Sequence, residues 1–257
     1  MKIQIVGSGV VGVATGKGFA RFGHDVTFVD IDPEVKRKLQ GFKFQTTHDL
    51  KADLYFICVP EKAVAEVVES LLHANIIVIR SSVPPGTTDA LSRNYSNRPI
   101  WHNPEFLREA TAEDDWLYEE YTLIGSPDVY INAGREGCPE LEELYASIGR
   151  EVVRCRAAES ELAKLLLNSH LASLISFWNE AQRLADAAGV NSHRVAKLVT
   201  LDKRISKYGA LKHGAPYGGR CLPKDLEQLL DFGLEHGVDA TLLSEVKNVN
   251  ERLKEQA

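Results

Sequence analysis

One segment near the C-terminal end combines a thiol, an amine and a carboxylate with two glycines. It reads YGGRCLPKD over residues 217–225. Glycines let the backbone approach a ligand closely and adopt a positive φ. Lys224 can place positive charge near Cys221, and positive charge favours the nucleophilic thiolate form of a cysteine. Because a lone cysteine is more often a small buried hydrophobe, this segment alone leaves both interpretations open.

A second polar pair, Lys164 and Asn168, stands inside an apolar helical pattern that runs from about residue 158 to 188. Residues four apart share a helix face, so the amine and the amide point the same way. They form either a functional pair or a snorkelling lysine beside a surface asparagine. A helix this long and apolar also predicts packing against a second copy, so we expect a homodimer through residues 158–188.

The N-terminal residues predict a dinucleotide site. A β-rich run over residues 2–6 leads into G-x-G-x-x-G at residues 7–12, and a helical pattern follows to about residue 22. In this motif the first glycine makes the turn, the second admits a pyrophosphate and the third allows close packing of helix and strand. The diphosphate lies at the helix N-terminus. The cofactor-binding residues expected here are Gly7, Gly9, Val10, Val11 and Gly12.

Asp30 identifies the preferred dinucleotide. It ends a second predicted strand, residues 25–29, at the position where the fingerprint requires an acidic residue. Its carboxylate can accept hydrogen bonds from both ribose hydroxyls and would repel a 2′-phosphate, which favours NAD over NADP. We interpret the nearby Asp32 as a turn residue before Pro33.

The remaining elements continue the alternation of strands and helices. Apolar strands are expected at 52–60, 75–80 and 99–102, and a helix at 63–72. This order predicts an α/β fold: a Rossmann-type parallel sheet domain over residues 1–156, followed by an all-helical domain over residues 157–257. Ligands of such sheets bind at the carboxyl ends of the strands. The helical domain should continue with a helix from Ser192 to about Ser206, the loop carrying Cys221, and a final pair of amphipathic helices.

The composition excludes several function classes. The chain has 257 residues, 44% of them hydrophobic and 26% charged, with a net charge of −6. Mild acidity without a long basic run argues against nucleic acid or an anionic membrane as partner. No apolar run reaches the roughly 18 residues of a membrane span. Because the first strand starts at once, we expect no signal peptide and a cytoplasmic enzyme or binding protein.

The other cysteines and two histidines carry no predicted chemistry. The four cysteines are scattered without a C-x-x-C pair, so we expect neither a metal site nor a disulfide framework. Cys58 is expected in the core, and Cys138 and Cys155 are expected to be unreactive. His102 and His213 are interpreted as polar loop residues rather than as ligands.

Five motifs in order resemble one family. They are GSGVVG at 7–12, RSSVPPGTT at 80–88, NPEFLRE at 103–109, ELAKLLLN at 161–168 and GGRCLPKD at 218–225. Together they resemble the nucleotide-sugar 6-dehydrogenases, in particular the UDP-glucose and GDP-mannose dehydrogenases. The resemblance extends from residue 1 to about residue 230.

The resemblance implies a four-electron oxidation of a sugar or nucleotide-sugar primary alcohol to a carboxylate with two NAD. It implies that Cys221 attacks the intermediate aldehyde to form a thiohemiacetal, which is oxidised to a thioester that water hydrolyses. Lys164 matches the family lysine that stabilises the developing oxyanion, and Asn168 matches its hydrogen-bonding companion. Asp225 matches an aspartate that works with an ordered water in proton transfer.

Further roles follow from the same resemblance. Glu109 matches a carboxylate implicated in thioester hydrolysis near the nicotinamide, and Ser82 stands where a family threonine helps to hold a water. The resemblance adds four residues to the expected cofactor site: Val59, Ser82, Glu109 and Lys224. The expected substrate-binding residues are Glu105, Phe106, Leu107, Lys164, Asn168 and Gly218.

Three departures from the family leave alternatives open. Family members usually carry a further C-terminal domain that binds the nucleotide of the substrate. The chain is therefore a trimmed enzyme, a subunit completed by another chain, or a fragment of a longer protein. The segment after Pro60 also lacks the Thr-Pro-containing loop of the family, and Pro216 stands where glycine is common.

Two other functions compete with the four-electron oxidation. A two-electron β-hydroxyacid-type dehydrogenase also joins a Rossmann domain to a helical domain with a Lys and an Asn one turn apart, but it needs no nucleophilic cysteine. The other competitor is a catalytically silent NAD-binding protein, which has no chemical need for Lys164, Asn168, Cys221 and Asp225 together.

Overall fold

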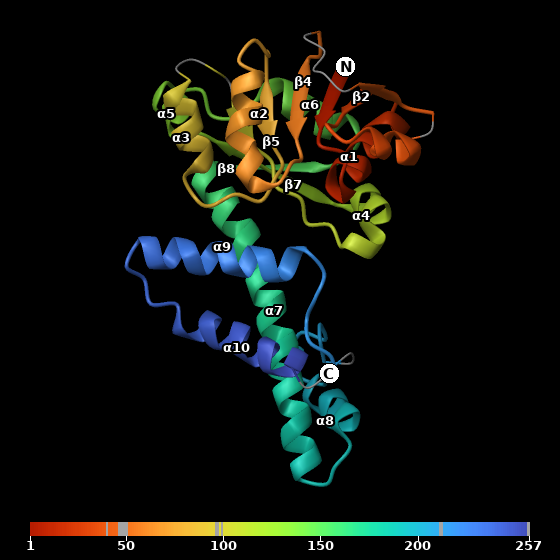
Figure 1. Cartoon of the computed structure of the whole chain (residues 1–257), viewed down its shortest axis with the longest axis vertical. Helices are drawn as coiled ribbons and strands as arrows, with labels where there is room; N and C mark the ends of the chain where they lie inside the picture. Colours follow the sequence, from red (N-terminus) through yellow and green to blue (C-terminus); the bar gives the residue numbers. More distant parts are fainter. Residues whose placement is uncertain (40, 46–50, 96–97, 99, 211–212, 256–257) are drawn as a thin grey trace. The chain divides into compact units, whose positions relative to one another are not determined.

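The computed structural model describes residues 1–39, 41–45, 51–95, 98, 100–210 and 213–255. It divides into two compact units, Met1–Lys164 and Leu165–Ala257. The first unit contains the sheet and the second is helical, and a single long helix begins in the first unit and continues into the second (Figure 1). The expected fold class, a Rossmann-type sheet followed by helices, is confirmed.

Eight strands form one sheet among the described residues, in the order β3-β2-β1-β4-β5-β6-β7-β8. Pairing is parallel from β3 to β6 and between β7 and β8, whereas β6 and β7 are antiparallel. The strands are β1 Lys2–Val6, β2 Asp25–Val29, β3 Lys43–Gln45, β4 Leu54–Ile57, β5 Ile77–Ile79, β6 Ile100–His102, β7 Tyr121–Ser126 and β8 Glu151–Arg156.

Both faces of the sheet are covered, which explains why its strands are apolar at consecutive positions. Phe56 and Val78 pack into one core cluster with residues of α1, α4 and α6. Their neighbours Ile57 and Ile79 belong to a second cluster with residues of α2 and α3. The helices of this unit are α1 Val10–Arg21, α2 Val64–Ser70, α3 Thr87–Asn94, α4 Ala112–Tyr118, α5 Asp128–Asn132 and α6 Pro139–Ser147, with short 3₁₀ turns η1 Pro33–Leu39, η2 Glu61–Ala63 and η3 Glu109–Thr111.

The long helix α7 spans Ala157–Ala187, close to the expected range. The predicted domain boundary at residue 156 lies where β8 ends and α7 begins, while the compact units meet at Lys164. The later helices are α8 Ser192–Val199, α9 Cys221–Glu235 and α10 Thr241–Glu255. None of the helices within the described ranges combines the length and apolarity needed to span a bilayer.

The prediction that α8 continues to about Ser206 is wrong, because the helix ends at Val199. The hydroxyl of Thr200 donates back to the Ala196 carbonyl at 2.9 Å. Beyond it, a side-chain oxygen of Asp202 accepts from the backbone N–H of Arg204 at 3.0 Å. Such local bonds compete with the helical ladder and replace it with a turn.

Candidate active site

The glycine turn after β1 has the shape that a dinucleotide requires. Gly7 has φ 92°, and a Cβ there would lie 2.6 Å from the Cys58 carbonyl oxygen. A Cβ at Gly12 would collide with the Gly7 carbonyl oxygen. At Gly9, by contrast, no described atom lies within 4 Å of a Cβ position. Gly7 and Gly12 are therefore needed for packing, whereas Gly9 leaves space open for an approaching group.

The start of α1 can hold an anion. Gly9 is the N-cap residue and provides no side chain, and the first turn contains no acidic residue. The first N–H groups of a helix have no intrahelical acceptor, so those of Val10, Val11 and Gly12 can serve a bound group. Together with the helix dipole they favour a diphosphate.

Asp30 lies beside this turn at the end of β2. Its Oδ2 accepts from the Ser8 N–H at 2.6 Å, and its Oδ1 accepts from the Asp32 N–H at 2.9 Å. An ionised carboxylate has about four lone-pair sites, so acceptor capacity remains for ribose hydroxyls. Asp32 accepts from the Glu34 N–H at 2.9 Å at the start of η1, which agrees with the turn role expected for it. The residues around the glycine turn thus fit NAD.

Val59 follows β4 and Ser82 follows β5, at the edge of the sheet where β1 also ends. The order β1-β4-β5 makes these strands neighbours. Ser81 Oγ donates to the Val59 carbonyl at 2.6 Å and contacts the Ile57 carbonyl at 3.2 Å, tying the two loops together. Ser82 is half-buried beside this anchor. The cofactor contacts predicted for Val59 and Ser82 remain predictions.

Lys164 is buried and paired with a carboxylate. Its Nζ lies 2.9 Å from Glu105 Oε1, and the two side chains are 3% and 5% exposed. Glu105 also accepts from the Leu107 N–H at 2.6 Å, and the ammonium lies 5.8 Å from the centre of the Phe106 ring. A snorkelling lysine would keep its ammonium in water, so that interpretation is wrong. The sequence had suggested Glu105 only as a substrate contact, and its pairing with Lys164 was missed.

The rest of the NPEFLRE segment is held by a different ion pair. Arg108 donates from Nε and Nη2 to Asp115 at 3.0 and 2.5 Å. Hydrogen bonds from Arg108 are the main cause that lowers the pKa of the Asp115 carboxyl to about 2. Glu109 begins η3 and is exposed, unlike Glu105. The roles predicted for Glu109 and Leu107 remain predictions.

Cys221 is the first residue of α9, not part of a loop. Gly219 precedes it with φ 72°, and Arg220 is the N-cap residue. The thiol of Cys221 is half-buried. A helix start is a place where the helix dipole favours a thiolate. Gly218 is exposed, and no described atom lies within 4 Å of a Cβ position there, which leaves room for the predicted substrate contact.

Asn168 and Asp225 are brought together in the second unit. Asp225 is fully buried and Asn168 is 6% exposed. The Asn168 amide donates to Asp225 Oδ2 at 2.5 Å, and Lys224 Nζ donates to Asp225 Oδ1 at 2.5 Å. Asn168 is therefore not a surface residue. Asp225 follows Cys221 by four residues on α9, so the two side chains share a helix face.

Lys224 is predicted to contact NAD. Its amine donates to Asp225 Oδ1 and lies 3.4 Å from Gln228 Oε1. A cofactor contact from this side chain remains a prediction.

The other cysteines have surroundings that disfavour the thiolate. Burial is the main cause that raises the pKa of Cys58 and Cys138 to about 12 and that of Cys155 to about 11. Among the described residues, no group of three His, Cys, Asp or Glu side chains is arranged to hold a metal ion.

The loop position expected for His102 is wrong. His102 lies in β6, fully buried, with Nδ1 2.6 Å from Ser160 Oγ. Burial lowers the pKa of this imidazole to about 3. His213 is also buried, between the Ala210 carbonyl at 2.7 Å and Ser192 Oγ at 2.9 Å. Both imidazoles thus belong to internal hydrogen-bond networks.

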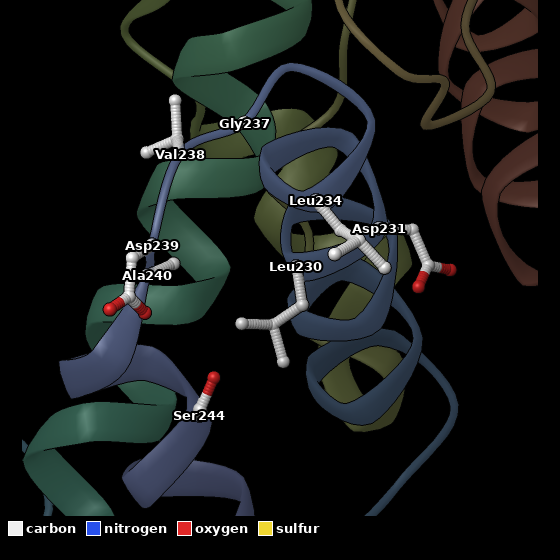
Figure 2. Close-up of a pocket in the computed structure, with 8 residues that line it drawn as sticks. All are labelled: Leu230, Asp231, Leu234, Gly237, Val238, Asp239, Ala240 and Ser244. Carbon is white, nitrogen blue, oxygen red and sulfur yellow. The ribbon is translucent and has the colours of Figure 1, made fainter.

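A hollow of about 510 Å³ lies between α9 and α10 (Figure 2). It is lined by Leu230, Asp231, Leu234, Gly237, Val238, Asp239, Ala240 and Ser244. None of the predicted site residues belongs to this lining, so we do not assign the hollow to the candidate active site.

The sheet, the glycine turn and Asp30 define a dinucleotide-binding protein of the Rossmann class. Comparison with family models identifies it further. Residues 1–51 and 35–149 match the NAD binding domain of the UDP-glucose/GDP-mannose dehydrogenase family, and residues 158–252 match its central domain. The chain belongs to this family. The expected family, its enzyme class of NAD-dependent dehydrogenases and the cofactor NAD are thereby confirmed.

Individual relatives agree with the family match. UDP-glucose 6-dehydrogenase of Rickettsia conorii is 32% identical, over 98% of this chain and 67% of the relative. The enzyme of the same name from Rhizobium meliloti is 32% identical, over 99% of this chain and 68% of the relative. The structure of a UDP-glucose dehydrogenase from Pyrobaculum islandicum superimposes with a TM-score of 0.82 at 28% identity, over 98% of this chain and 68% of that chain. The chain thus spans about two thirds of the length of these relatives.

Proposed function

We propose that this chain catalyses the NAD-dependent, four-electron oxidation of the primary alcohol of a nucleotide sugar to a carboxylate. One observation carries the proposal beyond family membership. Cys221 begins α9 one helical turn before Asp225, whose buried carboxylate holds the amide of Asn168. A thiol, an amide and a carboxylate placed in this way suit covalent catalysis. A two-electron dehydrogenase has no use for the thiol.

NAD, when bound, supplies the two-electron oxidant for each of the two oxidations. The chain's own residues would hold it through the turn at Gly9, the first N–H groups of α1 and the Asp30 carboxylate. The open space at Gly9 is the feature that fits the diphosphate.

The thiol of Cys221 attacks the aldehyde carbon to give a thiohemiacetal, whose oxidation yields a thioester. Water then cleaves the carbon–sulfur bond and regenerates the thiol. The Lys164 ammonium, which lies 2.9 Å from Glu105 Oε1, and the Asn168 amide stabilise negative charge on the reacting oxygen. Asp225 takes part in proton transfer together with a water, and Ser82 and Glu109 assist as the family motifs imply.

We propose UDP-glucose as the first substrate to test, because the relatives at 32% identity are named UDP-glucose 6-dehydrogenases.

We also propose a homodimer through the helix expected at 158–188. Leu166, Phe177 and Leu184 on α7 are 47%, 59% and 69% exposed, and their spacing places them along one helix face. The molecular mass of the protein in solution tests this assembly.

A cytoplasmic location is proposed because none of the four cysteines forms a disulfide, which suits a reducing compartment.

The substitution Cys221→Ser tests the mechanism. Wild-type chain should form two NADH for each carboxylate when it is supplied with NAD and UDP-glucose or GDP-mannose. Cys221→Ser should abolish steady-state carboxylate formation while NAD binding persists. Cys155→Ser is the matched control and should retain activity, since burial disfavours the thiolate of Cys155.

Undiminished carboxylate formation in Cys221→Ser would show that the thioester route is wrong. One NADH for each substrate molecule would instead support the two-electron alternative. Cofactor binding without turnover of any sugar nucleotide would support a catalytically silent protein.

A further inference from the structure

Glu161 is a buried carboxylate that the proposed chemistry does not use. It lies near the start of α7 and is 0% exposed. Its Oε1 accepts from the Thr88 N–H at 2.8 Å and from Thr88 Oγ1 at 2.6 Å. Its Oε2 accepts from the Gly86 N–H at 2.6 Å. Gly86, with φ 91°, is the N-cap residue of α3, so Glu161 caps a helix that is distant in sequence.

The carboxylate joins two segments that carry proposed site residues. The segment 80–88 follows β5, is anchored by Ser81 to the Val59 carbonyl at 2.6 Å, and includes Ser82. The second segment is the start of α7, which carries Lys164 three residues after Glu161. The Lys164 ammonium forms an ion pair with Glu105. These contacts all lie within the first unit, Met1–Lys164.

We propose that Glu161 is a positioning residue for the oxidation, whose carboxylate holds the 80–88 segment against the start of α7 so that Ser82 and Lys164 keep their working positions. This inference rests on the proposed function, and it adds a residue to which no catalytic or binding role has been assigned. Glu161 acts through Ser82 and Lys164 and touches neither substrate nor cofactor.

The three donors favour an ionised carboxylate. A carboxylate accepts on both oxygens, whereas a glutamine or a protonated glutamic acid presents a donor on one side. That donor would face the N–H of Gly86 or the donors of Thr88, so at least one of the three hydrogen bonds would be lost or weakened.

This carboxyl changes its protonation state within the pH range of the kinetic test given below. Burial raises the pKa of Glu161 to about 7, against the opposing effect of the hydrogen bonds from Thr88 and Gly86. Asp89 faces it from α3 and raises the pKa further. Lys164 lies one turn along α7 with its charge engaged by Glu105. The hydrogen-bonded form therefore becomes populated as pH rises through about 7.

The kinetic test compares Glu161→Gln with Glu159→Gln. Glu159 is an exposed residue of the same helix that accepts from the Arg156 N–H at 2.8 Å. With wild type, kcat should rise through about pH 7 in a profile measured from about pH 5.5 to about pH 8.5. Glu161→Gln should lower kcat by roughly tenfold to a hundredfold, as misplaced catalytic groups do, and should lose this rise. Glu159→Gln should behave as wild type. A Glu161→Gln enzyme with the wild-type kcat and profile would overturn the proposal.

A second variant covers the case in which Glu161→Gln does not fold. Thr88→Val removes one hydroxyl donor and leaves the carboxylate in place. Because the hydrogen bonds from Thr88 lower the pKa of Glu161, Thr88→Val should move the rise in kcat to higher pH. An unmoved rise would contradict the proposal.

Hydrogen exchange separates this inference from the proposed function. In wild type without substrate, the Gly86 and Thr88 amides should be protected above about pH 7 and lose protection below it, after correction for the intrinsic pH dependence of exchange. Protection that does not change with pH would refute the role of Glu161 even in an active enzyme. Conversely, the protein could show pH-dependent protection and yet oxidise no nucleotide sugar. That result would refute the proposed function, but it would still show that Glu161 attaches the 80–88 segment to α7.

Discussion

Removing both members of the Lys164–Glu105 pair should destabilise the protein by clearly less than the sum of the two single removals. The charged atoms lie 2.9 Å apart, and the side chains are 3% and 5% exposed. Lys164→Met leaves a buried carboxylate that keeps the bond from the Leu107 N–H, and Glu105→Gln leaves a buried ammonium. Breaking a buried ion pair from one side costs about 3–5 kcal/mol. In the double variant neither charge remains, and the amide oxygen introduced by Glu105→Gln can still accept from the Leu107 N–H. We therefore expect the double variant to lose about 3 kcal/mol less stability than the sum of the two single variants, which is the coupling energy of the pair.

Thermal and urea unfolding of wild type, both single variants and the double variant measures this coupling. Each single substitution should lower Tm by about 6–20 °C, since 1 kcal/mol corresponds to about 2–4 °C for a chain of this length. The surface pair Lys17–Glu113, 2.7 Å apart and 30% and 56% exposed, is the control. Its coupling should be about 0.2–1 kcal/mol. Single effects at Lys164 and Glu105 that add to within about 0.5 kcal/mol would refute the reasoning, because two buried charges in contact cannot act independently.

Two further predictions concern the cofactor site. Gly9→Val should leave Tm nearly unchanged, because a Cβ there meets no described atom within 4 Å. The same side chain should block the approach of the diphosphate and weaken NAD binding roughly tenfold or more. Gly12→Val should instead unfold the turn, because its Cβ collides with the Gly7 carbonyl. Melting curves and calorimetric titration with NAD distinguish the two, and equal loss of stability in both would contradict this division of roles. Asp30→Asn keeps an acceptor for the Ser8 N–H but removes the charge, so the preference for NAD over NADP should fall roughly tenfold or more. An unchanged ratio of the two dissociation constants would show that Asp30 does not select the cofactor.

Local signals allowed much of the fold to be predicted from the sequence. The β-rich run at 2–6, the glycines that follow and the acidic residue at 30 lie within one short unit, and each constrains its neighbours. The apolar stripe of α7 repeats over many turns, so both its type and its approximate ends were recoverable. The family, which five such motifs in order predicted, is confirmed by family models that match residues 1–51, 35–149 and 158–252.

The start of α9 and the end of α8 were not predicted correctly, for identifiable reasons. The sequence suggests a loop at Cys221, but Pro223 lies in the first turn of α9, where proline is tolerated because the N–H it lacks has no partner there. The helical pattern after Ser192 persisted beyond Val199, but the side chains of Thr200 and Asp202 form local bonds that end the helix. In both cases side-chain chemistry outweighed periodicity.

The burial of the site's polar residues could not be inferred from sequence, and it bears directly on function. A lysine among leucines suits a snorkelling side chain as well as a buried ion pair, and only a partner distant in sequence, Glu105, decides between them. The same holds for Asn168 and its buried partner Asp225. Charged and polar groups in such positions are costly, and well-packed apolar residues of similar size are often neutral or stabilising replacements. A protein that only bound NAD would have no chemical use for these buried groups that offsets the free energy of burying them. The two buried pairs therefore argue for catalysis, and they favour the dehydrogenase over its catalytically silent alternative.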